Sequence, residues 1–164
     1  MSTQKQATEH LREMIKDIRI AMLSTQETDG TLRSRPMYVQ QLEDDDDLWF
    51  FTNESSAKIK EIMHDKNVNL SFSEPDDDRY ISVSGTAQMV DDMNKKEELW
   101  NPMLKAWFPD GLDDPDLTLL KINPSQGEYW DAPSSKMVQL AGFVKATVTG
   151  ESYDAGGMNE KVSL

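Results

Sequence analysis

The sequence predicts an α+β fold in which about six short strands form a small antiparallel barrel with helices appended to it. Several short segments alternate apolar and polar residues and are separated by antiparallel turn signals. A few other segments repeat their apolar residues at helical spacing. The chain has 164 residues, a length that suits one domain with a core of its own.

The first part of the chain is predicted to hold an amphipathic helix followed by a β-hairpin. The helix covers residues 7–18, and a buried strand covers residues 20–25. An Asp-Gly dipeptide then favours a tight turn into a second strand over residues 31–41. Pro36 in this strand has no amide donor, so we expect a sheet edge or an irregularity there.

The remaining elements follow from the same two patterns, with Gly85 as a candidate β-bulge in one of the strands. Residues 1–150 are predicted to form the domain and residues 151–164 a loosely ordered C-terminal tail. The expected elements are an acidic loop at 44–47, a strand at 48–52, a short helix with a buried stripe of Ile59, Ile62 and Met63, strands at 68–72 and 81–84, a helix from a cap at Asp91-Asp92 to Trp100, strands at 117–122 and 128–131, and a periodic stretch at 137–148.

The composition excludes several classes of function. Acidic residues outnumber basic ones by 30 to 17, and a net charge of −13 disfavours nucleic acid and anionic membranes as partners. The chain has no cysteine, which excludes disulfides, thiolate metal sites and thiol nucleophiles. No apolar run is long enough to span a bilayer and no export signal is visible, so we expect a cytoplasmic location.

Against this acidic background, four cations gather within a short stretch of the sequence. They are Arg33, Arg35, Lys58 and Lys60, and the whole chain has only five arginines. Scattered solvated charge is the ordinary interpretation. The alternative is a local pocket for an anion.

The start of the second predicted helix is the best candidate for such a pocket. Lys58 lies in its first turn, where free amide donors and the helix dipole favour an anion. Hydroxyls of Thr52, Ser55 and Ser56 could add donors, and Arg35 could grip a phosphate with two parallel hydrogen bonds. The residue pattern alone favours a surface lysine and an ordinary cap, because serine-rich helix starts are common.

Aromatic residues give a second indication of a ligand. Core packing explains Trp49 best. Trp107-Phe108, between two prolines, is harder to place in one barrel core and could pack on a partner subunit or on a flat ligand. Trp130, like the others, lies beside a predicted strand or loop end.

Few residues could carry catalysis themselves. His10 and His64 have no second histidine or carboxylate at metal-ligand spacing, so no metal site is expected. The aspartate run at 44–47 lacks the alternating ligands and the glycine of a calcium loop. Any chemistry is therefore expected to come from an organic cofactor.

A set of motifs in the same order resembles the pyridoxamine-phosphate-oxidase-like FMN-binding split barrels, and more narrowly their general stress protein 26 branch. The resemblance covers nearly the whole chain. The motifs are LRSRPM at 32–37, LWFFTN at 48–53, SAKIKEI at 56–62 and YISVSGTA at 80–87 for the family, with ELWNP at 98–102, KAWFP at 105–109 and EYWD at 128–131 for the branch.

The resemblance implies a six-stranded Greek-key split barrel that binds FMN between the subunits of a homodimer. It implies that Arg35 contacts the phosphate or ribityl chain, and that Ser56 and Lys58 contact the phosphate. Phe51 and Thr52 match positions along the flavin, partly through backbone groups. The residues expected at the cofactor are Arg35, Pro36, Met37, Phe51, Thr52, Ser56, Lys58, Tyr80, Trp107, Phe108 and Trp130.

The chain also departs from the oxidases of this family. They carry an arginine and a histidine near the C-terminus that bind the substrate, whereas this chain has no arginine after Arg79 and no histidine after His64. Ala57-Lys58 stands where those oxidases have Arg-Lys. We therefore expect an FMN-dependent oxidoreductase-like protein of another substrate. The alternatives are an FMN binder for storage or redox sensing, and a barrel that has lost its cofactor.

Overall fold

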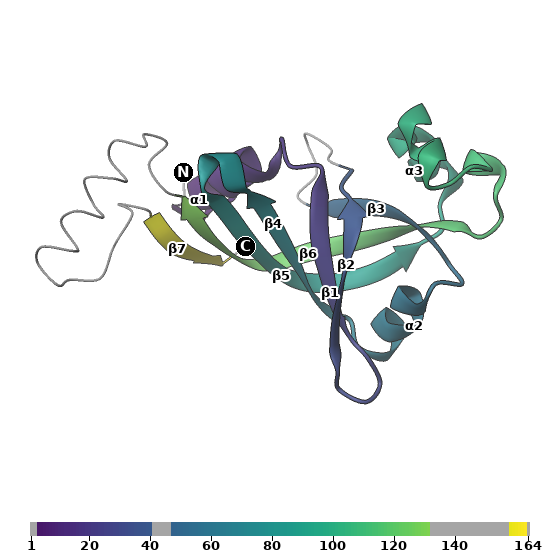
Figure 1. The fold of residues 1–164 in the computed structure, drawn as a ribbon, viewed down its shortest axis with the longest axis horizontal. Helices are drawn as coiled ribbons and strands as arrows, with labels where there is room; N and C mark the ends of the chain where they lie inside the picture. The colour runs from purple at the N-terminus through teal and green to yellow at the C-terminus, as the bar shows by residue number, and fades with distance from the viewer. Residues whose placement is uncertain (1–2, 41–46, 132–157, 164) are drawn as a thin grey trace, which may run out of the picture.

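The computed structural model describes residues 3–40, 47–131 and 158–163, and its strands form one curled antiparallel sheet (Figure 1). Six strands follow the order β2-β1-β4-β5-β6-β3, as the predicted small barrel requires, and β7 also pairs with β6. The strands are β1 (Ile20–Gln26), β2 (Leu32–Tyr38), β3 (Leu48–Asn53), β4 (Asn67–Glu74), β5 (Arg79–Val90), β6 (Leu117–Asp131) and β7 (Met158–Ser163).

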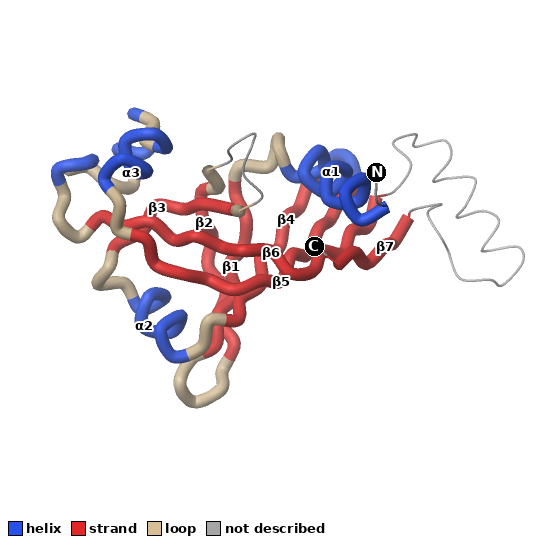
Figure 2. Tube along the Cα trace, turned by 180° about the vertical axis from the view of Figure 1, so that it is seen from behind, coloured by secondary structure: helices blue, strands red, loops and turns tan. Residues whose placement is uncertain are grey.

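Short helices lie around the sheet rather than between its strands (Figure 2). In both ribbon views α1 lies at the β7 end of the sheet, α3 lies at the opposite end, and α2 lies near the β1–β2 turn. In the described residues no helix is long and apolar enough to cross a membrane. The helices are α1 (Thr3–Ile15), α2 (Ala57–His64) and α3 (Met93–Leu99), with 3₁₀ turns η1 (Pro75–Asp77), η2 (Pro102–Ala106) and η3 (Gly111–Asp113).

Alternating burial along the strands builds the main core inside the curled sheet. Leu23 on β1, Leu70 on β4 and Val83 on β5 lie opposite one another and are almost completely buried. Their neighbours along each strand point to the other face, as a period of two requires. Ile59 and Ile62 of α2 join this core, so the second helix is fixed against the inside of the barrel.

A second, smaller core lies under the segment that contains α3 and the two following 3₁₀ turns. Phe51 of β3 packs there against Trp100 and Phe108, with ring centroids 5.5 and 6.4 Å away. Trp49 is also buried there, as expected for a packing residue, and the Lys95 ammonium lies 4.7 Å from the centre of its ring. This core fixes β3 from the side opposite to the main core.

Several features predicted from local sequence are present. Gly30 adopts a positive φ of 90° in the β1–β2 turn, and Pro36 lies on β2, an edge strand of the sheet. The Asp92 side chain accepts hydrogen bonds from the first amides of α3. The pairing of β5 with β6 shifts register between Ser84 and Gly85, which confirms the bulge.

The structure also corrects three expectations. Met63 is 75% exposed and does not belong to the buried stripe of α2, where Glu61 is buried instead. The two strands predicted at 117–122 and 128–131 are one continuous strand, β6, because β6 stays paired with β5 on both sides of the bulge. Residues 158–163 form β7, although a loosely ordered tail was expected, and the periodic stretch at 137–148 lies outside the described residues.

Candidate functional site

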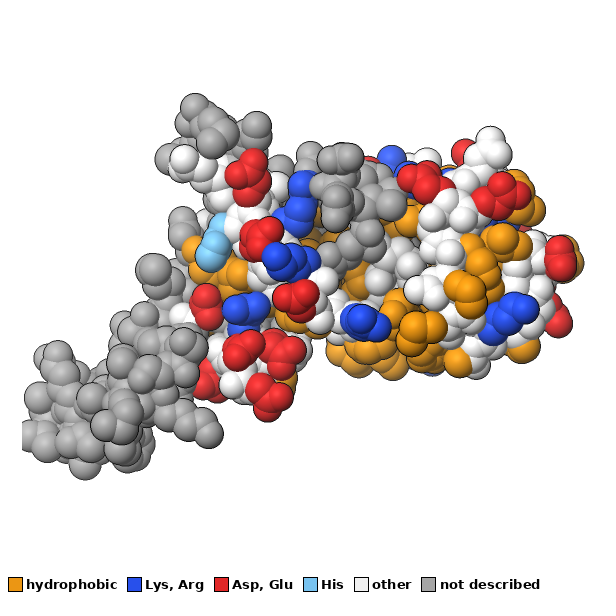
Figure 3. All heavy atoms as spheres, turned by 90° about the horizontal axis from the view of Figure 1, so that it is seen from above, with side chains coloured by type: hydrophobic (Ala, Val, Ile, Leu, Met, Phe, Trp, Pro, Cys, Tyr) orange, Lys and Arg blue, Asp and Glu red, His pale blue; other side chains and the backbone are white. Residues whose placement is uncertain are grey.

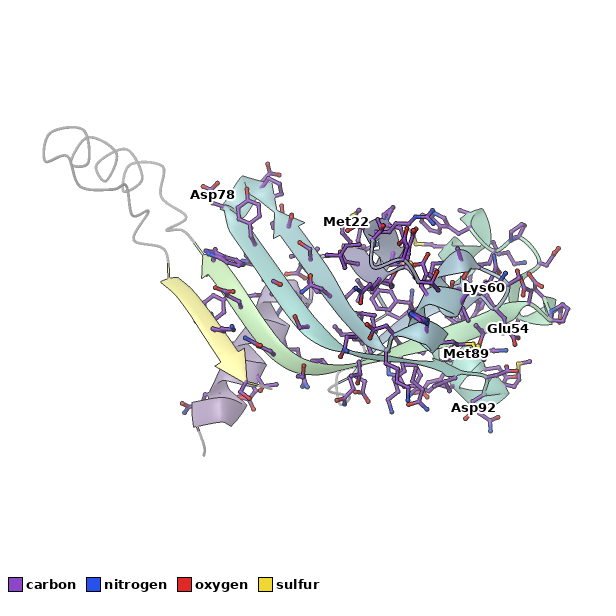
Figure 4. The ribbon with its side chains drawn as sticks, turned by 90° about the horizontal axis from the view of Figure 1, so that it is seen from below. Met22, Glu54, Lys60, Asp78, Met89 and Asp92 are labelled. Atoms are coloured by element: carbon purple, nitrogen blue, oxygen red, sulfur yellow. The ribbon has the colours of Figure 1, made fainter. Side chains whose placement is uncertain are left out.

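The segment between β3 and α2 gathers hydrogen-bond donors at a helix N-terminus. The apolar strand β3 ends at Asn53, and Ser56 precedes α2 with an extended backbone, φ −69° and ψ 153°. The first amides of a helix have no partner within the helix, and together with the helix dipole they attract negative charge. Figure 4 shows this segment, marked by Glu54 and Lys60, at the opposite end of the sheet from Asp78 in the β4–β5 turn.

Asp116 holds this segment in place from the start of β6. Its carboxylate accepts hydrogen bonds from the Ser55 amide at 3.0 Å and from the Ser55 hydroxyl at 2.7 Å. Its backbone carbonyl accepts a hydrogen bond from the Glu54 amide at 2.8 Å. The Ser55 hydroxyl is therefore already used, and the loop that leads into α2 is fixed by a residue far away in the sequence.

The Ser56 hydroxyl is in the opposite situation. It is buried, it does not cap α2, and it has no hydrogen-bond partner in the described part of the chain. A buried hydroxyl without a partner costs free energy, and such groups are rare in folded proteins. An anion at the start of α2 would supply the missing acceptor, so the residues present fit a phosphate group.

Lys58 places a positive charge in the first turn of the same helix. Its ammonium donates a hydrogen bond to the Thr52 hydroxyl at 2.8 Å. Burial, reinforced by the neighbouring Arg35 charge, lowers the pKa of Lys58 below its ordinary 10.5. The site therefore disfavours this charge when no anion is present, and an anion would relieve that cost.

Arg35 reaches the same region from β2 and is held by three partners. Its guanidinium donates to the Thr25 hydroxyl at 2.7 Å, to the Glu61 carboxylate at 2.8 Å and to the Leu23 carbonyl at 3.5 Å. Burial alone would raise the pKa of Glu61, but the Thr25 hydrogen bond and the Arg35 charge outweigh it and lower that pKa. Glu61 is therefore a charged partner of Arg35.

The cluster formed by Arg33, Arg35, Lys58 and Glu61, named the anion cluster below, is positive in a negative protein. The Arg33 guanidinium lies 3.8 Å from the Glu61 carboxylate, and Lys58 interacts electrostatically with Arg35, Glu61 and Arg33. Three cations and the Glu61 carboxylate sum to about +2, and the Glu27 carboxylate, 3.9 Å from the Arg33 guanidinium, lowers this to about +1. The remaining positive charge attracts a phosphate monoester, which carries ~−1.5 to −2. The cluster can therefore hold a dianion without a metal ion as bridge.

The other predicted contacts near this cluster lie in different environments. Pro36 is exposed on β2, but the Met37 side chain is 7% exposed and belongs to the main core. Phe51 and Phe108 pack in the second core, and Thr52 is buried beneath Lys58. Any ligand contact from Met37 or Phe51 would therefore come from the backbone.

In the part of the chain that the structure describes, the backbone of β3 has one open edge, unpaired beyond a single bridge. β3 pairs with β6 on one side, and among the described residues only the bridge between Gln40 and Trp49 links its other side to the chain. Antiparallel pairing directs the polar groups of alternate residues to opposite edges. Phe51, two residues after Trp49, thus presents its backbone N–H and C=O to the open edge, at the side of β2.

The remaining aromatic residues predicted at the cofactor lie on the outer face of the sheet, the face that carries the exposed residues Ile20, Tyr80 and Trp130. Tyr80 pairs directly with Trp130 across β5 and β6, and the two are 42% and 40% exposed. Trp107, 57% exposed, has its ring 5.5 Å from that of Tyr38, the cross-strand partner of Ile20. The structure therefore separates these aromatics from the anion cluster, which lies on the inner side.

Sequence reasoning missed Thr25, Glu61 and Asp116. Glu61 follows Lys58 by three residues, so helical spacing alone could have placed both on one face of α2. Thr25 and Asp116 act through contacts between distant segments, and local patterns carry no signal for them. No group of three His, Cys, Asp or Glu side chains suited to a metal ion occurs in the ranges that the structure describes.

Comparison with known proteins gives the family of this chain and agrees with its fold. The family model "Pyridoxamine 5'-phosphate oxidase like" matches residues 6–154. The chain belongs to this family. Its curled sheet and appended helices also match solved structures of the family over most of their length.

Three individual proteins show how far the similarity extends. Protein bli-3 of Neurospora crassa is 28% identical over 152 residues, which cover 87% of this chain and 73% of that protein. The crystal structure of general stress protein 26 from Bacillus anthracis str. Sterne is 31% identical with a TM-score of 0.67, covering 76% of this chain and 93% of that one. A general stress FMN/FAD binding protein from Xanthomonas citri is 31% identical with a TM-score of 0.69, covering 80% and 92%.

Proposed function

We propose that this chain binds FMN through its phosphate at the anion cluster and works as a flavin-dependent oxidoreductase-like protein of the general stress group. The observation that carries the proposal is the buried Ser56 hydroxyl without a partner, next to Lys58 in the first turn of α2. The X. citri relative, described as an FMN/FAD binding protein, supports a flavin as the ligand. The cytoplasmic location expected from the sequence stays a prediction.

The arrangement of donors at the start of α2 favours FMN over FAD. FMN ends in a phosphate monoester, which carries ~−1.5 to −2 at neutral pH. The two phosphates of FAD are joined to each other as a pyrophosphate that continues into an adenosine, so each has fewer free oxygens than the FMN phosphate for Ser56, Lys58 and the amides of α2. A site that surrounds a terminal phosphate therefore fits FMN better.

Each part of the chain has a separate task in this proposal. Ser56, Lys58 and Arg35 bind the phosphate, and the open edge of β3 at Phe51 offers backbone donors and acceptors to a ring. The flavin, when bound, supplies the transfer of electrons or hydride. The acidic surface repels competing anions, so the positive cluster selects one phosphate group in an otherwise negative molecule.

We also propose a homodimer in which the second copy covers the outer face. Ile20, Met22, Tyr80 and Trp130 are exposed there by 46, 39, 42 and 40%. Apolar side chains that gather on one sheet face indicate a protein interface. The anion cluster and these aromatics lie on opposite sides of one sheet, so within one chain they do not contact the same part of a ligand. We propose that the ring projects past the unpaired edge of β3, where the partner copy contacts it.

The direct test is a fluorescence titration of the purified protein with FMN, riboflavin and FAD. We expect saturable binding near one FMN per chain, with weaker binding of riboflavin and FAD. Arg35→Ala or Lys58→Ala should weaken FMN by about ten- to a hundredfold, the loss of one charge-assisted contact, and leave riboflavin nearly unchanged. Equal weakening of both ligands would refute the phosphate assignment.

A second candidate function is an FMN binder for storage or redox sensing. It is favoured by the contents of the anion cluster, whose titratable groups are engaged with one another or with structural partners rather than placed as a proton donor and acceptor pair. Turnover of a reduced nicotinamide well above the rate with free FMN would decide for the oxidoreductase. Saturated binding without such turnover would decide for storage or sensing.

A further inference from the structure

Glu61 is an unexpected group beside a site for an anion. It lies on α2 one helical turn after Lys58, is only 8% exposed, and carries a negative charge. A buried carboxylate repels a nearby phosphate, so its charge alone would weaken binding. Glu61 must therefore contribute something to the site that offsets this repulsion.

The hydrogen bonds of Glu61 indicate what this contribution is. One of its carboxylate oxygens, Oε2, accepts a hydrogen bond from the Thr25 hydroxyl and another from the Arg35 guanidinium at 2.8 Å. Arg35 in turn donates to the Thr25 oxygen at 2.7 Å, which closes a three-membered ring of hydrogen bonds. Thr25 is 2% exposed on the buried face of β1, so the ring is anchored in the core.

We infer that Glu61 is a positioning residue that holds Arg35 in one orientation for a phosphate group. An arginine side chain has many rotamers, and ordering it during binding reduces affinity. The ring orders it beforehand, and a guanidinium has five N–H donors, so donors remain beyond those given to Leu23, Thr25 and Glu61. The inference rests on the proposed phosphate site, and it adds a function for a residue that does not touch the ligand.

The two effects of Glu61 have opposite signs, which makes the inference testable. If the carboxylate acts only by its charge, Glu61→Gln removes a repulsion and FMN binds more tightly. If it positions Arg35, the same change frees the guanidinium and FMN binds less tightly in spite of the extra positive charge. A purely structural role would weaken FMN and riboflavin equally.

The experiment is a titration of wild type, Glu61→Gln and Thr25→Val with FMN and riboflavin, followed by flavin fluorescence. We expect the ratio of FMN to riboflavin affinity to fall about three- to tenfold in both variants, the cost of ordering one side chain. Thr25→Val leaves the charge unchanged and conserves volume, so it tests positioning even if Glu61→Gln folds poorly. Glu97→Gln, an exposed carboxylate on α3, is the matched control and should leave the ratio unchanged.

A second comparison shows whether Glu61 acts through Arg35. In an Arg35→Ala background, Glu61→Gln should no longer lower the ratio, because the positioning effect is already lost and only the relief of the carboxylate's repulsion is left. Tighter FMN binding in Glu61→Gln, an unchanged ratio in both variants, or a further fall of the ratio in the Arg35→Ala background would overturn the inference. A wild type without preference for FMN over riboflavin would instead overturn the proposed phosphate site itself.

Discussion

Ser55 and Ser56, the two serines before α2, differ in whether the side-chain hydroxyl has a hydrogen-bond partner, and this difference decides their roles. The Ser55 hydroxyl donates to Asp116 at 2.7 Å, whereas the Ser56 hydroxyl is buried without a partner in the described residues. Ser55→Ala should lower the free energy of unfolding by ~0.5–1.5 kcal/mol, the usual worth of one hydrogen bond. Ser56→Ala should leave the stability of the ligand-free protein unchanged or slightly higher and weaken FMN by about tenfold.

Each variant serves as the control for the other. Thermal or urea unfolding without ligand measures stability, and flavin fluorescence measures affinity. If Ser56→Ala destabilises the ligand-free protein as much as Ser55→Ala does and binds FMN like wild type, the hydroxyl is structural and has no ligand role.

The lowered pKa of Lys58 predicts how FMN binding depends on pH. Lys58 loses its proton at a lower pH than a solvated lysine, because burial and Arg35 disfavour its charge. FMN affinity should therefore fall as the pH rises through this lowered pKa, below the ordinary 10.5. Between the two values the unfolded chain binds more protons, so Lys58 makes the ligand-free protein more stable as pH rises there.

Titration of FMN from neutral to alkaline pH tests this prediction, with Lys58→Arg as the comparison. Arginine keeps its charge throughout this range, so the alkaline loss of affinity should disappear in that variant. At the acid end the protein's stability again rises with pH, this time because of Glu61, since its folded pKa also lies below the ordinary value. Its lowered pKa stabilises the protein above the ordinary 4.5, and this contribution is lost as pH falls through the folded value.

At the scale of elements, the bulge in β5 and β6 shapes the sheet. A Cβ at Gly85 would lie 2.3 Å from the Asn123 carbonyl oxygen, much closer than van der Waals contact permits. Gly85→Ala should therefore lower the free energy of unfolding by ~1–3 kcal/mol, the range for overpacked positions. Thr86→Ala, at an exposed neighbouring position, should change it by less than ~0.5 kcal/mol. Equal effects in urea unfolding would show that the close approach is not needed.

Local patterns predicted the elements whose cause is local. The Asp-Gly turn, the Asp92 cap and the Gly85 bulge each depend on one or two residues and were found. β7 was missed because its polar sequence has no alternation, and its pairing with β6 is what makes it a strand. Met63 was wrongly predicted to be buried. It directly follows the buried Ile62, and one step along a helix rotates the side chain by about 100°, here from the core to solvent.

The candidate site shows the same limit. Lys58 and Ser56 could be proposed as ligand contacts only with the family resemblance, because the local pattern by itself favours a surface lysine and an ordinary helix start. The roles of Glu61, Thr25 and Asp116 could not, because each depends on contacts between segments that meet only in the folded sheet. Hydrogen bonds across such distances leave no periodic pattern.

At the scale of the whole molecule, the net charge opposes dimerisation and the exposed apolar surface favours it. Each chain carries −13, so two copies repel at low salt. The exposed apolar residues of the outer face favour association, and further hydrophobic side chains gather at the surface toward the α3 end (Figure 3). We therefore expect the homodimer to tighten with added salt, because screening removes the repulsion and leaves the apolar contact.

Analytical ultracentrifugation at low and moderate salt measures this balance. Trp130→Arg puts a charge on the outer face beside Tyr80, at a position 40% exposed in the single chain, and should shift the protein to monomer. Met63→Arg, at a 75% exposed position on α2, is the matched control and should remain dimeric. If ring contacts come from the partner, the Trp130→Arg monomer should also lose affinity for FMN and riboflavin alike, because the phosphate contacts of the anion cluster stay within one chain. A wild-type monomer that binds FMN at full affinity would refute the shared site.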